Sequence, residues 1–106
     1  MKISDIYSEK KSLSFEIFPP KKTEDLENID ETLAVLCECD PDFISVTFGA
    51  GGSSNCNRTI ELAKKIKNQY HVEPVVHLTC LHYDKQEIDE FARVLTEEGI
   101  QNVLAL

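Results

Sequence analysis

The chain has 106 residues, of which 42% are hydrophobic and 28% are charged, a balance typical of one folded domain rather than a disordered chain. Nineteen acidic residues against 11 basic ones give a net charge of −8. This charge argues against a nucleic acid or an anionic membrane surface as partner. Four cysteines without a CxxC pair, and no apolar leader or membrane-length apolar run, predict free thiols in a cytoplasmic protein.

Apolar stretches that recur about every thirty residues, the length of one βα unit, predict four β-strands. The predicted strands cover residues 13–18, 43–48, 74–80 and 102–106. Amphipathic patterns between them predict three helices, over residues 23–39, 57–69 and 85–98. Thr23 is the expected N-cap of the first helix, and Asp84 with Glu87 has the spacing of a capping box at the third. Gly99 suits the left-handed position after that helix.

The apolar side of each predicted helix is expected to face a sheet. These positions are Leu26, Ile29, Leu33 and Leu36 in the first helix, Ile60, Leu62, Ala63 and Ile66 in the second, and Ile88, Phe91, Ala92 and Leu95 in the third.

The order β-α-β-α-β-α-β predicts an α/β fold with parallel strands joined by right-handed crossovers. Leu106 closes an apolar strand that no further helix covers, and parallel sheets are normally covered on both faces. We therefore expect residues 1–106 to be one partial domain, the N-terminal half of an eight-stranded βα-barrel of the TIM type in a longer protein. An open doubly wound sheet is the alternative.

Each of the first three predicted strands has one face that carries a polar residue near its carboxyl end: Glu16, Thr47 and His77. In a βα-barrel these faces converge inside, near the rim where catalytic groups lie. Taken singly, Glu16 is also compatible with an exposed edge charge, His77 with a structural histidine and Thr47 with an ordinary strand residue. The opposite faces are apolar and suit packing against helices.

Two further motifs bear on binding chemistry. The run GAGG, residues 49–52, follows a strand and permits close approach of a ligand, but it matches neither GxGxxG nor a P-loop. His77 and Cys80 point to opposite faces of one strand, so no metal site is predicted.

The chain resembles the 5,10-methylenetetrahydrofolate reductase family. The segments that carry the resemblance are SFEIFPPK (14–21), DFISVTFGAGG (42–52), Arg58-Thr59, HLTC (77–80) and the final NVLAL. The similarity runs from about Ser12 to Leu106, roughly the first third of a complete reductase. It implies a βα-barrel that holds FAD at the carboxyl ends of its strands. In such an enzyme NAD(P)H reduces the flavin, and the flavin reduces 5,10-methylenetetrahydrofolate to 5-methyltetrahydrofolate.

The resemblance also implies roles for single residues. Glu16 matches the family's catalytic glutamate, a general acid for the nitrogen that leaves when the folate ring opens. We expect burial beside Phe15 and Phe18 to raise the pKa of this carboxyl. The residues implied to contact cofactor are Thr47, beside flavin and nicotinamide, and Phe48, Ala50, His77 and Leu106, beside the flavin. Asn55-Cys56-Asn57 departs from the charged residues that many members carry there.

The resemblance implies a small-molecule folate substrate and, for the full-length protein, a homo-oligomer or an accessory subunit. The 106 residues alone are expected to lack reductase activity. Two alternatives are a folate- or corrinoid-dependent methyl-transfer barrel without flavin and a non-catalytic βα domain that binds a partner. The choice between NADH and NADPH stays open.

Overall fold

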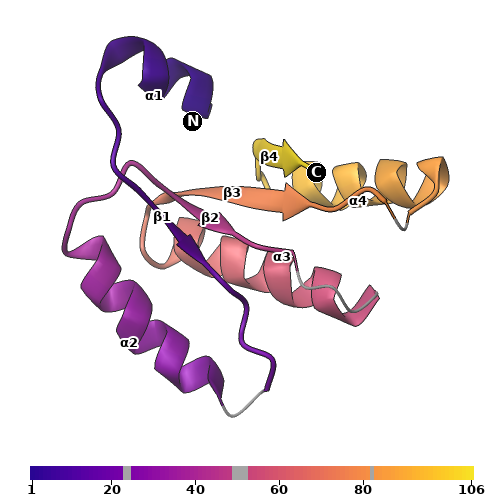
Figure 1. Cartoon of the computed structure of the whole chain (residues 1–106), viewed down its shortest axis with the longest axis horizontal. Coiled ribbons are helices and arrows are strands. Elements are labelled where there is room, and N and C mark those ends of the chain that lie inside the picture. The colour runs from indigo at the N-terminus through magenta and orange to yellow at the C-terminus, as the bar shows by residue number, and fades with distance from the viewer. Residues whose placement is uncertain (23–24, 49–52, 82) are drawn as a thin grey trace.

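The computed structural model describes residues 1–22, 25–48, 53–81 and 83–106, and it alternates helices with parallel strands (Figure 1). The elements are α1 (Ile3–Glu9), β1 (Ser14–Ile17), α2 (Leu26–Cys37), β2 (Phe43–Val46), α3 (Ser53–Asn68), β3 (Glu73–Leu78), α4 (Lys85–Glu97) and β4 (Asn102–Ala105). Every strand lies within a stretch predicted from the sequence, apart from Glu73 at the start of β3.

The four strands form one parallel sheet in chain order, β1-β2-β3-β4. Buried residues of α2, α3 and α4 belong to the same core cluster as the apolar face of the sheet, so these helices cover one face. A doubly wound sheet would reverse its strand order and carry helices on both faces. Sequential strands with all crossover helices on one side are the arrangement of consecutive βα units in a barrel, as predicted.

The core lies between this sheet face and the three crossover helices. It contains Ile17, Ile44, Val46, Val76 and Leu78 from the strands and Leu33, Ile60, Leu62, Ala63, Ile66, Phe91 and Leu95 from the helices. Phe15, Phe48 and Cys80 are half-buried against it. The predicted apolar strand faces therefore do pack on helices, because alternate strand side chains point to one side.

The structure confirms some of the predicted helix ends and corrects others. Asp84 and Glu87 form the predicted capping box, each side chain accepting a 2.8 Å hydrogen bond from the other residue's backbone amide. Gly99 has a φ of +68°, which suits a residue without a Cβ. α3 begins at Ser53, earlier than predicted, and α2 begins at Leu26 with Asp25 as its N-cap residue. The predicted N-cap Thr23 lies outside the described residues.

One predicted core position is wrong. Ala92 is exposed, whereas its neighbours Phe91 and Leu95 are buried. Successive helical residues differ by about 100° around the axis, so a core that receives Phe91 and Leu95 leaves Ala92 at the edge of the contact.

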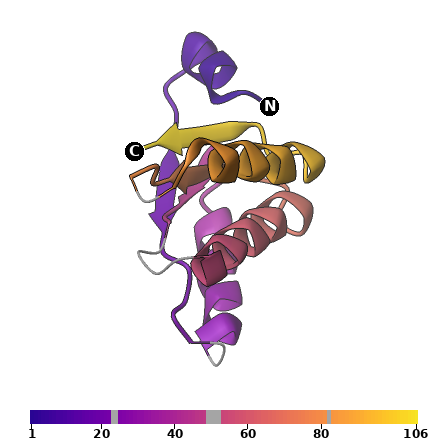
Figure 2. The same ribbon diagram turned by 90° about the vertical axis from the view of Figure 1, so that its right-hand side faces the viewer.

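The sequence reading did not predict α1, which stands apart from the other three helices in both views (Figure 1 and Figure 2). Its Ile6 is buried, and the ring of Tyr7 meets Phe43 edge to face at a centroid distance of 5.9 Å. The amide of Ile3 donates a 3.0 Å hydrogen bond to Oδ1 of Asn102, at the start of β4. α1 thus covers the amino end of the sheet face that the crossover helices leave open.

Each helix in the described part of the chain is too short or too polar to span a lipid bilayer.

Candidate functional site

The sheet face opposite α2, α3 and α4 carries a mixed polar and apolar surface. A cavity of about 490 Å³ lies on it, and its lining includes Glu16, Ser45, His77 and Leu104 from the four strands. Ile3 and Tyr7 of α1 line the same cavity at its amino end. Parallel strands bring their carboxyl ends to one edge, so this face offers polar groups where barrel enzymes hold their ligands.

Two predicted site residues meet on this face. Oε2 of Glu16 lies 3.6 Å from Nε2 of His77, too long for a hydrogen bond but within ion-pair range when the imidazole is protonated. β1 and β3 are not neighbours, because β2 runs between them. Glu16 is paired across the ladder with Ser45, whose small side chain leaves the space above β2 in which carboxylate and imidazole approach.

The two partners differ in exposure. The His77 side chain is 9% exposed, whereas the Glu16 side chain is 54% exposed. The prediction that Glu16 is buried beside Phe15 and Phe18 is wrong for this structure. Strand alternation sends Phe15 to the helix side, and Phe18 is itself 71% exposed. Glu16 is therefore a solvent-accessible carboxylate beside an almost buried imidazole.

Thr47 lies at the same edge, directly after β2. Its amide donates a 3.0 Å hydrogen bond to the carbonyl of Ile17, which extends the pairing of β1 with β2 by one residue. Its carbonyl accepts a 3.2 Å hydrogen bond from Oγ1 of Thr59 on α3. The peptide groups on both sides of Thr47 are thus held.

The side chain of Phe48 lies on the helix side of the sheet. Its ring contacts Tyr83 and Phe91 edge to face, at centroid distances of 5.9 and 5.6 Å. For a ligand on the open face, Phe48 therefore presents its backbone rather than its ring. Ala50, with the rest of the glycine run 49–52, lies outside the described residues.

Leu106 extends the last strand pair at the carboxyl edge. Its amide donates to the carbonyl of Leu78 at 2.8 Å, and its own carbonyl accepts from the amide of Cys80 at 2.9 Å. Its side chain is 62% exposed. His77 and Cys80 lie on opposite sides of the sheet, as predicted, since Cys80 packs against the helix-side core. Over the described ranges, no three His, Cys, Asp or Glu residues are grouped so as to hold a metal ion.

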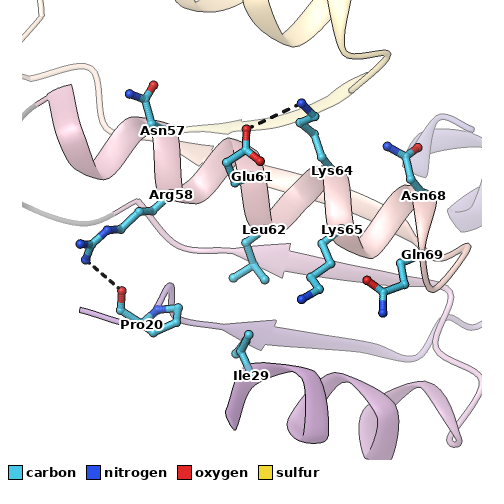
Figure 3. Close-up of a pocket in the computed structure, with 10 residues that line it drawn as sticks. All are labelled: Pro20, Ile29, Asn57, Arg58, Glu61, Leu62, Lys64, Lys65, Asn68 and Gln69. Carbon is cyan, nitrogen blue, oxygen red and sulfur yellow. Dashed lines mark hydrogen bonds and ion pairs between the residues drawn. The ribbon is translucent and has the colours of Figure 1, made fainter. Parts of the chain in front are cut away.

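The structure also gives contacts to Arg58, a residue that the sequence singled out without assigning a contact. Nη1 of Arg58 donates a 3.2 Å hydrogen bond to the carbonyl of Pro20 (Figure 3). It donates a second hydrogen bond to the carbonyl of Lys21. Arg58 is 38 residues from Pro20 and 37 residues from Lys21 in the chain. A local pattern does not reveal such a contact, and the only sequence signal was the Arg58-Thr59 pair itself.

Comparison with known proteins is consistent with this arrangement. The family description "Methylenetetrahydrofolate reductase" matches residues 2–106. A rice protein named probable methylenetetrahydrofolate reductase (NADH) is 42% identical over 93 residues, which are 88% of this chain and 16% of the rice protein. The maize methylenetetrahydrofolate reductase (NADH) 1 is 41% identical over 90% of this chain and 16% of its own length.

Shorter bacterial relatives match the same region. The 5,10-methylenetetrahydrofolate reductase of Escherichia coli is 35% identical over 95 residues, which are 90% of this chain and 32% of the bacterial protein. The chain thus spans between about a sixth and a third of the length of these relatives. Because the family match covers nearly every residue, and the sheet has the strand order of a TIM barrel, the chain belongs to the methylenetetrahydrofolate reductase family.

Proposed function

We propose that residues 1–106 form the first half of the barrel of a flavin-dependent reductase that converts 5,10-methylenetetrahydrofolate to 5-methyltetrahydrofolate with NAD(P)H. The observation that carries the proposal is the Glu16–His77 pair on the open face of a sheet whose sequence matches this family. The rice and maize relatives are named for NADH, so NADH is the first donor to test.

The described residues fit a flavin at the carboxyl edge of the sheet. His77 offers an almost buried imidazole, and Leu104 and Leu106 offer exposed apolar surface beside it. Thr47 follows β2 with both flanking peptides held. Thr47, His77 and Leu106 would hold the cofactor, which requires both polar contacts and an apolar wall. A bound flavin would accept a hydride from reduced nicotinamide and supply one to the methylene carbon of the folate.

The protein's own contribution to the reaction is a proton. Opening the five-membered ring of the folate breaks a carbon–nitrogen bond, and the departing nitrogen keeps the electron pair and needs a proton. Glu16, in its protonated form, donates it from the open face. His77 lies 3.6 Å away and is almost buried, so it limits where the Glu16 carboxyl can move above β2.

The test is Glu16→Gln in the assembled reductase, meaning this segment together with the remaining strands of its barrel. Glutamine keeps the size of the side chain but carries no acidic proton. We expect folate reduction to fall by roughly a hundredfold or more, while bound flavin is still reduced by NADH. Glu31→Gln, at an exposed position of α2, is the matched control. Folate reduction at a near wild-type rate in the Glu16 variant, with flavin retained, would show that Glu16 is not the acid.

An absorption spectrum tests the cofactor part separately. The purified 106-residue chain is mixed with FAD, and excess FAD is removed. A visible flavin band that stays with the protein would support a flavin site on this half of the barrel. In the assembled reductase, a protein that never retains flavin and yet reduces folate would contradict the proposal.

A further inference from the structure

Two consecutive residues of α3 reach two different loops of the sheet's carboxyl edge. Arg58 contacts the segment that follows β1, and Thr59 contacts the end of β2. Successive residues of an α-helix point about 100° apart around its axis. One turn of α3 can therefore contact the neighbouring loop through one side chain and the sheet beneath it through the next. Figure 3 shows Arg58 extending from α3 toward Pro20.

The loop after β1 has fewer backbone donors than an ordinary loop. Pro19 and Pro20 have no amide hydrogen, so their nitrogens cannot donate to the rest of the fold. The carbonyls of Pro20 and Lys21 remain as acceptors, and Nη1 of Arg58 donates to both. Hydrogen bonds from a charged donor are stronger than neutral ones. The guanidinium therefore restrains a segment that starts only a few residues after Glu16.

The contact made by Thr59 joins a fully buried residue to a half-buried one. Thr59 has no exposed surface, and its hydroxyl donates to the carbonyl of Thr47 at 3.2 Å. Because the donor belongs to a fully buried residue, this bond favours one orientation of the peptide after Thr47. The peptide before Thr47 is already held by Ile17 of β1. The direction of the Thr47 side chain is then set from both sides.

We propose that Arg58 and Thr59 are positioning residues for the reaction: Arg58 holds the β1 side of the site, which carries Glu16, and Thr59 holds the β2 side, which carries Thr47. The inference rests on the proposed function. It adds that neighbouring residues of one helix control two different parts of the site and affect different half-reactions.

The geometry is tested in the 106-residue chain by NMR. The carbonyl carbons of Pro20, Lys21 and Thr47 are each observed through the amide of the next residue. Arg58→Met, which keeps length but has no donor, is expected to shift the Pro20 and Lys21 signals and to leave Thr47 unchanged. Thr59→Val is expected to shift Thr47 and to leave the other two unchanged, and Thr59→Ser is expected to restore the wild-type Thr47 signal.

Matched controls come from α4. Arg93 is exposed and pairs with Glu90 and Glu97, and the hydroxyl of Thr96 donates to the carbonyl of Ala92 within the helix. Arg93→Met and Thr96→Val should leave all three carbonyl signals in place. If Thr59→Val does not fold, Arg58→Met decides, because Arg58 is only half-buried. Unchanged Pro20 and Lys21 signals in Arg58→Met, or shifts spread through the core, would overturn the proposal.

The functional half is measured in the assembled reductase. Displacing a reacting group slightly can cost roughly tenfold to a hundredfold in rate. Arg58→Met should lose that much in folate reduction while the flavin is reduced by NADH at the wild-type rate, and Arg58→Lys should recover part of it. Thr59→Val should slow the reduction of the flavin by NADH, and Thr59→Ser should restore the wild-type rate of that step. Equal losses in both half-reactions for both variants would contradict separate positioning. An inactive wild-type protein with the expected NMR pattern would instead refute the proposed function.

Discussion

The two faces of the sheet differ in burial and in polarity. On the helix side, Ile44, Val46 and Val76 are fully buried among apolar side chains of three helices. On the open side, Glu16, Ser45 and His77 line a cavity together with the half-exposed Leu104. Among the described elements, α1 covers the amino end of this face. The closed face supplies most of the hydrophobic stabilisation, so the open face is free to carry groups that are costly to bury and useful for chemistry.

The largest expected effect is a direct test of this division. Leu33→Ala on the closed side removes a fully buried side chain, and we expect it to lower the free energy of unfolding by about 2–5 kcal/mol. Leu104→Ala removes the same atoms from the open face, where the side chain is 45% exposed, and should cost less than about 1 kcal/mol. Urea denaturation of the 106-residue chain measures both. Equal losses would mean that the open face is packed in solution.

A smaller effect is expected where α1 covers the open face. Asn102 is buried, its Oδ1 accepts from the amide of Ile3, and its Nδ2 donates to the carbonyl of Met1 and to Oε1 of Glu73. Asn102→Ala leaves these groups without their partner, at an expected cost of about 1–3 kcal/mol in the free energy of unfolding. The exposed Asn68 on α3 gives the control Asn68→Ala.

Amide hydrogen exchange distinguishes a local loss of the α1 contacts in Asn102→Ala from a general loss of stability. Amide exchange in α1 should accelerate strongly, while that of β3 follows only the global loss of stability. If α1 remains protected in the variant, the Asn102 contacts are not what holds it on the sheet.

The smallest effect is a pH dependence at the amino edge of the sheet. The hydrogen bond from Lys10, followed by that from the amide of Leu13, holds the pKa of the Asp42 carboxyl below its usual 3.8. A lowered pKa contributes stability that is complete above the unfolded-state value and is lost as pH falls through the folded-state value. At neutral pH the Asp42→Asn variant should therefore have a lower free energy of unfolding than the wild type. The difference between the two should become smaller as pH falls below about 4.

Urea midpoints measured between pH 6 and pH 2 would show this narrowing for Asp42→Asn. Asp89→Asn, at an exposed position of α4, serves as the control. If the difference in the free energy of unfolding between wild type and Asp42→Asn stays constant from pH 6 to pH 2, the Lys10–Asp42 contact does not form in solution.

Prediction from sequence succeeded where the signal is local and periodic. Alternation along the strands identified the helix-side face, and spacing along the helices identified Leu33, Ile66 and Leu95 as core. The capping box at Asp84 is likewise encoded within four residues. These features depend on which side chains share a face, and backbone geometry alone decides that.

Prediction failed where the exposure or contacts of a residue depend on elements that are distant in the sequence. Strand alternation places Glu16 on the same face as the other polar residues, and that was predicted, but its exposure depends on which layer covers that face. α1 was missed because seven residues with few apolar positions give a weak periodic signal, and its docking depends on Asn102 at the other end of the chain.

The sequence by itself determined the order of the four strands and the three crossover helices, the apolar side of each, and the family, because periodicity and motifs depend on residues that are close together in the chain. Only the tertiary structure decided that Glu16 and His77 meet across β2, that α1 covers the amino end of the open face, and that Arg58 and Thr59 hold two loops. Each of these contacts joins residues far apart in the chain, and their distance follows from packing and register rather than from any local preference.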